Sequence, residues 1–220
     1  MIIVGAKGFA KEVLEILHQN SYPEDRIVFF DNVNNDIPDL LYGKFPVLKN
    51  ERQVKDFFYS TENSFTLGLG SPSHRMKLGL LFEKWGGELT STISSKANLG
   101  HFGVQLGEGI NLMTGSTLTN DIKIGRGALI NLHCTIGHDC DLGDFVELSP
   151  GTHISGNCKL GNYCNLGTNA TVLPNVVLGE NVIVGAGAVV TKDIPSNSLV
   201  VGVPAKLVKE LPLIDSGLNK

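Results

Sequence analysis

An aliphatic residue occupies every sixth position from Leu106 to Val190, and this period restricts the fold more than any other feature of the sequence. The fifteen positions are Leu106, Leu112, Leu118, Ile124, Ile130, Ile136, Leu142, Leu148, Ile154, Leu160, Leu166, Val172, Leu178, Val184 and Val190. Leu, Ile and Val make up only about a quarter of typical residues, so chance does not explain an unbroken run of this length. A period of six predicts a parallel β-helix, in which each hexapeptide forms a short strand and a corner and three hexapeptides complete one coil.

A second row, four residues after the first, contains only small or β-branched residues. Its members are Ile110, Ser116, Ile122, Ala128, Cys134, Cys140, Val146, Thr152, Cys158, Cys164, Ala170, Val176, Val182, Ala188 and Ile194. We expect both rows to point inward, with each aliphatic side chain stacked on the residue three hexapeptides away. A slip of one residue would expose every aliphatic side chain, so the register should be unique. About five coils are expected.

All four cysteines belong to the second row. We therefore interpret Cys134, Cys140, Cys158 and Cys164 as small apolar core residues with reduced thiols, and not as metal ligands or disulfides.

The first part of the chain follows a different pattern, in which short apolar runs alternate with amphipathic segments. Strands are expected at residues 1–5, 26–31 and 64–70, and helices at residues 11–20, 51–60 and 73–86. This alternation predicts a small parallel α/β sheet. The expected fold is thus an α/β N-terminal Rossmann-like domain at residues 1–90, followed by a left-handed parallel β-helix with a C-terminal tail at residues 91–220; the left-handed sense is implied by the resemblance described below.

Composition excludes several classes of partner. The net charge is −4, and no cluster of Lys and Arg is present to bind the phosphates of nucleic acid. No apolar stretch reaches the roughly 18 residues of a membrane span. The apolar N-terminus has no basic region before it and does not match a signal peptide. The sequence predicts a cytoplasmic protein with no nucleic-acid or membrane partner.

The stretch "INLHCTIGHDCDLGDF" contains two histidines, His133 and His138, that lie outside both inward rows. They should face outward or occupy corners. Their spacing raises a zinc hypothesis, but the residues one coil away are not ligands: Asn120, Gly156, Gly115 and Gly151. Zinc would therefore need a third histidine from a neighbouring subunit. An ordinary surface role and a catalytic role are the alternatives.

Three motifs carry a resemblance to a known family: the repeat closing with "VVGVPAK", the opening "VGAKGFAKEV", and "HDCDLGDFVELSPG". Together they resemble the left-handed β-helix acyltransferases, and more narrowly the subfamily of sialic acid O-acetyltransferases and nucleotide-amino-sugar N-acetyltransferases. The resemblance implies a homotrimer with active sites between subunits, acetyl-CoA as acyl donor and no metal. It implies that a nucleotide-linked 4-amino-4,6-dideoxy sugar is the acceptor.

The resemblance assigns the catalytic roles to His138, Asp139 and Asn131. An amine that attacks a thioester must lose a proton, and an imidazole with a pKa near 6.5 can accept it. A carboxylate beside the imidazole fixes its tautomer and stabilises the imidazolium. Asn131 matches a polar residue near the acceptor, although its amide could equally bridge a corner.

The acyl donor is expected to contact Glu147, Gly156, Thr168 and Ala186, which match family contact positions. Small side chains leave room for the pantetheine arm, and Lys206 and Lys209 could face the phosphates of the donor. Glu147 departs from the family, because many members have a histidine there that touches the donor.

The loop "GAKGFA" joins a strand to a helix, whose N-terminus offers free N–H groups to a phosphate. By resemblance, the residues that contact the nucleotide sugar are Lys7, Gly8, Phe9, Asp31, Asn32 and Gly70. Phe9 is a second departure, since the family often has a histidine there. NAD is not expected, because the domain is too short to hold a second nucleotide half-site.

Three functions remain open from the sequence. The first is an acetyl-CoA-dependent acetyltransferase that N-acetylates a nucleotide-linked amino sugar. The second is an O-acetyltransferase acting on sialic acid or a related sugar. The third is a non-catalytic trimeric scaffold that binds a sugar nucleotide.

Overall fold

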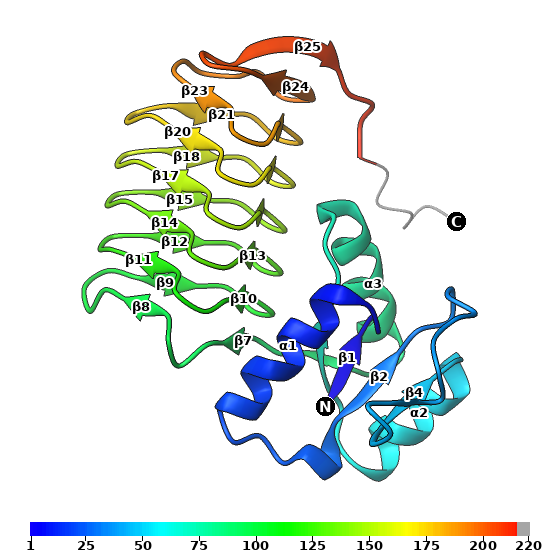
Figure 1. Ribbon diagram of the computed structural model, residues 1–220. Coiled ribbons are helices and arrows are strands. Elements are labelled where there is room, and N and C mark those ends of the chain that lie inside the picture. The colour runs from blue at the N-terminus through cyan, green and yellow to red at the C-terminus, as the bar shows by residue number, and fades with distance from the viewer. Residues whose placement is uncertain (215–220) are drawn as a thin grey trace.

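The computed structural model describes residues 1–214, which form an α/β region lying beside the first coils of a column of stacked short strands (Figure 1). Residues 215–220 of the expected C-terminal tail lie outside the described part of the chain. Within residues 1–214, no helix is both long and apolar enough to cross a bilayer.

The α/β region contains one sheet in the order β3-β4-β2-β1-β5-β6. Its elements are β1 (Ile2–Val4), α1 (Gly8–Gln19), the short helix η1 (Glu24–Arg26), β2 (Val28–Phe30), β3 (Leu40–Leu41), β4 (Phe45–Leu48), α2 (Glu51–Ser60), β5 (Ser64–Leu67), α3 (Pro72–Lys84) and β6 (Glu88–Leu89). All pairs are parallel except β3 with β4, which form an antiparallel addition that the sequence pattern did not reveal. The chain places β2 on one side of β1 and β5 on the other, so the strand order reverses between β1 and β5.

Aromatic residues fill the core between this sheet and its helices. Phe82 lies at its centre, with ring centroids 5.0 Å from Phe30, 5.2 Å from Phe65 and 5.0 Å from Trp85. The packing joins α3 to β2 and β5, and so determines where the loops after these strands lie.

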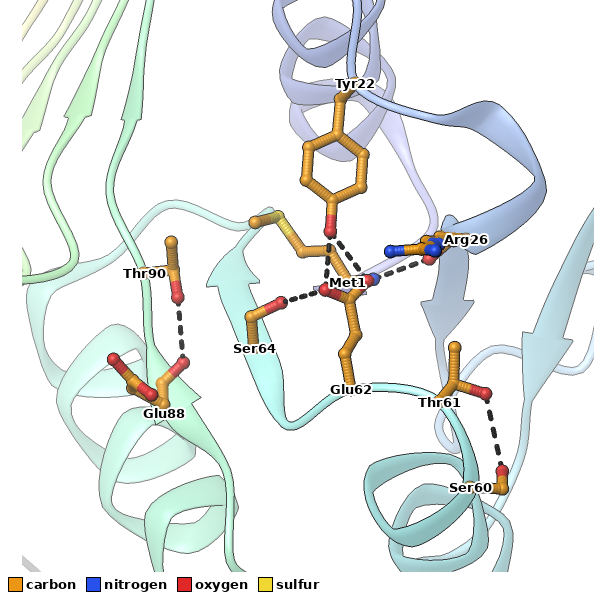
Figure 2. Close-up of polar contacts among 9 residues, drawn as sticks. All are labelled: Met1, Tyr22, Arg26, Ser60, Thr61, Glu62, Ser64, Glu88 and Thr90. Carbon is orange, nitrogen blue, oxygen red and sulfur yellow. Dashed lines mark hydrogen bonds and ion pairs between the residues drawn. The ribbon is translucent and has the colours of Figure 1, made fainter.

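The start of β1 is held by polar contacts around Glu62 (Figure 2). The Glu62 carboxylate pairs with the Met1 ammonium and accepts hydrogen bonds from the Tyr22 hydroxyl at 2.6 Å and the Ser64 hydroxyl at 3.0 Å. Burial together with this carboxylate raises the pKa of Tyr22 to about 12. These contacts anchor the strand that leads into the Gly5–Gly8 loop.

The β-helix has three faces, each a sheet of strands stacked one coil above another. The first face contains β7 (Thr92–Ile93), β10 (Asn111–Leu112), β13 (Leu129–Ile130), β16 (Glu147–Leu148), β19 (Asn165–Leu166), β22 (Ile183–Val184), β24 (Ser198–Val201) and β25 (Lys206–Glu210). The second contains β8 (Asn98–Leu99), β11 (Thr117–Leu118), β14 (Thr135–Ile136), β17 (His153–Ile154), β20 (Thr171–Val172) and β23 (Val189–Val190). The third contains β9 (Gln105–Leu106), β12 (Lys123–Ile124), β15 (Asp141–Leu142), β18 (Lys159–Leu160) and β21 (Val177–Leu178).

The predicted left-handed β-helix is confirmed. Ile130 pairs with Leu112 on one side and with Leu148 on the other, as the stacking of the aliphatic row requires. Every member of that row is buried except Leu106, which is partly buried in the first coils. In the second row only Ile194, near the end, is partly exposed.

The column is longer than the sequence period indicated. An earlier coil begins with Ile93 and Leu99, and Leu106 follows Leu99 after seven residues instead of six. Counting by sixes from Leu106 therefore misses it. At the other end, β24 pairs with β22, and β25 turns back antiparallel to β24 and closes the column.

A third row at the corners has left-handed backbone conformations, with φ between 53° and 76° at every sixth residue. Its members are Gly109, Gly115, Asp121, Gly127, His133, Asp139, Phe145, Gly151, Asn157, Tyr163, Asn169, Asn175, Asn181 and Gly187. Gly, Asn and Asp adopt this conformation most readily. The exceptions are His133, Phe145 and Tyr163. Phe145 and Tyr163 stack on each other with ring centroids 6.1 Å apart, and Phe145 is buried against the core of the α/β region. The backbone period continues where the two regions meet, but there two aromatic residues replace Gly, Asn or Asp.

Candidate active site

His138 and Asp139 lie at the corner between β14 and β15. The His138 Nδ1 and the Asp139 Oδ2 are 2.7 Å apart, and both side chains are largely exposed, at 63% and 55%. Because Nδ1 is engaged with the carboxylate, the favoured tautomer leaves the lone pair on Nε2 free to accept a proton. The left-handed conformation of Asp139 belongs to the corner period, but its carboxylate also orients the imidazole.

Gly156 lies one coil after His138 and next to the Nε2 and Cε1 atoms of the imidazole. A Cβ atom on Gly156 would come within 2.7 Å of the His138 Nε2. The absence of a side chain at Gly156 therefore makes the observed ring position possible. His133 has a similar relation to Gly115, but it has no carboxylate partner.

The two histidines lie at different edges of the column. We define the His138 edge as the corners at residues 119–122, 137–140, 155–158 and 173–176. The Asn131 edge comprises the corners at 113–116, 131–134, 149–152, 167–170 and 185–188. The face that contains β14 separates these two edges. Within residues 1–214 there is no group of three or more His, Cys, Asp or Glu side chains that could hold a metal ion.

The predicted catalytic and donor-binding residues divide between these edges, except for Glu147, which lies in β16 on the first face. Asn131, Thr168 and Ala186 lie along the Asn131 edge, with Thr168 and Ala186 exposed one above the other. Gly156 lies on the His138 edge. The Asn131 Oδ1 accepts a hydrogen bond of 2.7 Å from the Leu132 N–H, so this oxygen does bridge its corner.

All six residues predicted to contact the nucleotide sugar line one cavity of about 660 Å³: Lys7, Gly8, Phe9, Asp31, Asn32 and Gly70. The cavity lies at the carboxyl ends of β1, β2 and β5, where the strand order reverses and where ligands bind in open α/β sheets. Helix α1 begins beside it, and its N-cap residue Lys7 provides no side-chain cap to the first N–H groups.

Asp31 does not present a free carboxylate to this cavity. Its Oδ1 accepts hydrogen bonds from the N–H groups of Val33 at 3.1 Å and Asn34 at 2.9 Å, and its Oδ2 accepts one from the Asn34 side chain at 2.9 Å. Burial alone would raise the pKa of Asp31, but these bonds outweigh it and lower the pKa. Asp31 thus shapes the loop after β2.

Two basic residues of α3, His74 and Lys77, also line the cavity, and sequence reasoning missed them. They are three residues apart and therefore share one side of the helix. The sequence could have indicated them by their position, because they come just after Gly70, at the start of a helix that follows a strand.

Glu147 projects from β16 on the first face toward the α/β region. Its Oε2 accepts a hydrogen bond of 2.6 Å from the Ser71 N–H. Burial raises the pKa of Glu147, and this bond and the Arg75 guanidinium only partly offset the effect. In this chain the carboxylate therefore faces the loop that carries Gly70, while its predicted contact with the acyl donor stays a prediction.

Arg75 is completely buried between the two regions. Its guanidinium donates to the Leu69 carbonyl at 2.9 Å, to the Gly127 carbonyl at 3.0 Å and to the Asn111 Oδ1 at 2.7 Å. Burial lowers its pKa to about 10, so the side chain remains charged at neutral pH. Arg75 thus connects the Leu69–Ser71 loop, which carries Gly70 of the cavity, to the β-helix.

The prediction that the cysteines are core residues is confirmed, because all four are buried and none forms a disulfide. Each thiol lies within hydrogen-bonding distance of the backbone carbonyl fifteen residues ahead, at 3.2 Å for Cys134 and 3.1 Å for Cys164. Ser116 donates in the same way to the Asn131 carbonyl at 2.7 Å. Small residues with a donor group therefore suit this row.

Two family models match the chain. The PglD N-terminal domain matches residues 1–79, and the bacterial transferase hexapeptide (six repeats) matches residues 157–192. None of the curated proteins matches the chain significantly.

Solved structures match over nearly the whole length. A mutant perosamine N-acetyltransferase from Caulobacter crescentus, in complex with CoA and GDP-perosamine, is 31% identical with a TM-score of 0.86, and the match covers 95% of this chain and 96% of that one. WeeI from Acinetobacter baumannii is 31% identical with a TM-score of 0.84, over 94% and 100% of the two chains. The acetyltransferase domain of PglB from Neisseria gonorrhoeae, in complex with acetyl coenzyme A, is 29% identical with a TM-score of 0.82, over 94% and 98%.

Proposed function

This chain belongs to the hexapeptide-repeat acetyltransferases that have a PglD-type N-terminal domain, and from that premise we propose that it N-acetylates a nucleotide-linked 4-amino-4,6-dideoxy sugar with acetyl-CoA. The observation that carries the proposal is the whole-length likeness to perosamine N-acetyltransferase, whose complex contains CoA and GDP-perosamine. The described residues support it with a cavity at the switch point of the sheet and an oriented histidine on the β-helix.

The neutral amino group of the sugar attacks the thioester carbonyl carbon of acetyl-CoA. As the C–N bond forms, the amine proton passes to the Nε2 of His138, and Asp139 stabilises the imidazolium. The tetrahedral intermediate then collapses, the C–S bond breaks, and CoA leaves with a proton. The products are the acetamido sugar and free CoA.

The acceptor approaches from the Asn131 edge of its own chain. Phe9, which lines the cavity, packs in a small cluster with Ile16, Met113, Leu129 and Leu132, and Leu132 follows Asn131 directly. The His138 edge lies across the second face. A complete site therefore needs the His138 edge of another copy, and we propose a homotrimer with a site in each groove between neighbouring β-helices.

In this arrangement, acetyl-CoA runs along the groove between one subunit's Asn131 edge and the next subunit's His138 edge. Thr168 and Ala186 offer little obstruction on one side, and Gly156 offers none on the other. Lys206 and Lys209, which are exposed in β25 at the end of the column, are the proposed contacts for its phosphates.

We assign the reaction to the cytoplasm and to polysaccharide biosynthesis. The four unpaired cysteines agree with a reducing compartment.

A panel of UDP-, GDP- and dTDP-linked 4-amino sugars tests the proposal, with acetyl-CoA as donor and release of free thiol as the signal. We expect one nucleotide sugar to give rapid thiol release and an N-acetylated product by mass spectrometry. Acetylation of a sialic acid hydroxyl instead would favour the O-acetyltransferase. Nucleotide binding with no thiol release from any acceptor would favour the scaffold.

A further inference from the structure

Glu147 is a β-helix residue whose carboxylate is directed at the α/β region. In its strand ladder it stands between Leu129, which packs on the α/β region, and Asn165. Its side chain therefore lies at the border of the contact between the two regions, next to Gly70 at the rim of the cavity.

The residue that Glu147 holds, Ser71, has an unfavourable backbone conformation. Its φ is +69°, in the left-handed region that residues other than glycine seldom occupy. Its side chain provides no cap to α3. Such conformations persist where the surroundings determine them, and they often occur at functional sites. Here the Ser71 N–H donates to the Glu147 carboxylate at 2.6 Å, and the Ser71 carbonyl accepts from the Arg75 N–H at 2.9 Å.

The position of the Glu147 carboxylate also depends on the neighbouring residue Gly70. A Cβ atom on Gly70 would lie 3.0 Å from the Glu147 Oε1, so the lack of a side chain makes room for the carboxylate. On the other side of the loop, the Leu69 carbonyl accepts from Arg75, which is itself bonded to the β-helix. The Leu69–Ser71 loop is thus held on both sides by charged groups that the β-helix positions.

We propose that Glu147 is a positioning residue for the acceptor: it fixes the Gly70–Ser71 loop at the rim of the cavity instead of contacting the acyl donor. The identity of the acceptor as a nucleotide sugar rests on the proposed function, whereas the restraint on the loop does not. Glu147 thus places the acceptor relative to its own β-helix, one of the two neighbouring β-helices that form the proposed groove for the donor.

Steady-state kinetics with both substrates tests this role. Glu147→Ala should raise KM for the nucleotide sugar about tenfold or more, as expected for the loss of one charge-assisted hydrogen bond, and should change KM for acetyl-CoA less than about twofold. Glu147→Gln retains an oxygen that can accept the Ser71 N–H, and should restore KM for the sugar to within about threefold of the wild type. If Glu147 contacted the donor, Glu147→Ala would raise KM for acetyl-CoA and leave KM for the sugar nearly unchanged, and that result would overturn the proposal.

Glu83→Gln is the matched control. The Glu83 Oε1 lies 2.5 Å from an Arg126 guanidinium nitrogen, so this pair also joins the two regions, but neither residue lines the cavity. The control should leave both KM values within about twofold of the wild type. A rise in the KM for the sugar equal to that of Glu147→Ala would mean that any weakening of the interface has the effect, and would contradict a specific role.

Hydrogen exchange of the ligand-free protein gives a result that does not depend on the acceptor. The Ser71 amide should exchange slowly in the wild type and in Glu83→Gln, and fast in Glu147→Ala, while the amides of β1 and β5 stay protected in all three proteins. An unchanged Ser71 amide in Glu147→Ala would sink the proposal. If no amino sugar is acetylated, the proposed function fails, but this experiment still decides the role of Glu147.

Discussion

The β-helix and the α/β region bury their cores in different ways, and the candidate functional residues are placed accordingly. In the β-helix each inward side chain stacks on one three hexapeptides away, such as Ile130 on Leu112. In the α/β region, Phe82 contacts Phe30 across more than fifty residues with no repeat. The periodic core leaves its corners free to vary, so His138 can be exposed at no cost to packing. The non-periodic core instead concentrates its cavity at the ends of the strands.

The largest expected effect concerns a corner residue. His138→Ala should lower kcat by about 10²–10⁴-fold, or about 3–5 kcal/mol of barrier, because it removes the proposed general base. KM for both substrates should change much less, since proton removal occurs only on the way to the transition state. Stability should hardly change, because the side chain is exposed.

His133→Ala is the control for this substitution, because the His133 ring also lies next to a glycine one coil away but has no carboxylate partner. It should leave kcat near the wild-type value. Equal losses in the two variants, or retention of more than about a tenth of the rate in His138→Ala, would show that His138 is not the base.

The next largest effect is a loss of stability that distinguishes the core of the α/β region from that of the β-helix. Phe82→Ala should destabilise the α/β region by about 3–5 kcal/mol, and Leu148→Ala should destabilise the β-helix by about 2–5 kcal/mol, because each leaves a cavity. Trp85 is the only tryptophan in the chain and lies in the α/β region, so its fluorescence reports that region. In denaturant titrations, Phe82→Ala should move the midpoint seen by fluorescence more than that seen by circular dichroism.

Leu148→Ala should do the opposite, moving the circular dichroism midpoint at least as far as the fluorescence midpoint. If both variants moved both midpoints equally, the two regions would unfold as one cooperative unit and the distinction between them would not extend to stability.

A smaller effect is expected for Gly156→Ala. The new Cβ would lie too close to the His138 Nε2, so the imidazole must move, and a displacement of this kind should lower kcat about tenfold or more. In the His138→Ala background the same substitution should have almost no further effect on kcat, because there is no ring left to displace. Additive losses in the double variant would place the action of Gly156 elsewhere, for example on the acyl donor.

The smallest response is expected from the cysteines. A thiol reagent should label Cys134, Cys140, Cys158 and Cys164 slowly in the native protein and rapidly in denaturant, because all four are buried. Burial raises the pKa of Cys134 to about 11 and that of Cys164 to about 12. Raising the pH from 7 to 9 should therefore form little thiolate at these two sites and leave their labelling slow. Fast native labelling would contradict the packing of the second row.

Periodicity predicted the β-helix closely but could not locate its beginning. From Leu106 onward, the sequence pattern matches the observed stacking, because the inward-facing residues recur every six positions. The single extra residue between Leu99 and Leu106 shifts the phase, which hides the first coil from a count by sixes. The third row at the corners was also present in the sequence as a series of Gly, Asn and Asp, with His133, Phe145 and Tyr163 as the exceptions.

The sequence by itself determined the inward rows and the core position of the cysteines, because each depends on residues one coil apart; the pairing of His138 with Asp139 was implied by the family resemblance. Only the tertiary structure decided that Glu147 contacts Ser71 and that Arg75 contacts Asn111. These contacts join residues 76 and 36 positions apart on elements with unrelated periods. No local pattern encodes such a pair, since it depends on how the α/β region docks against one face of the β-helix.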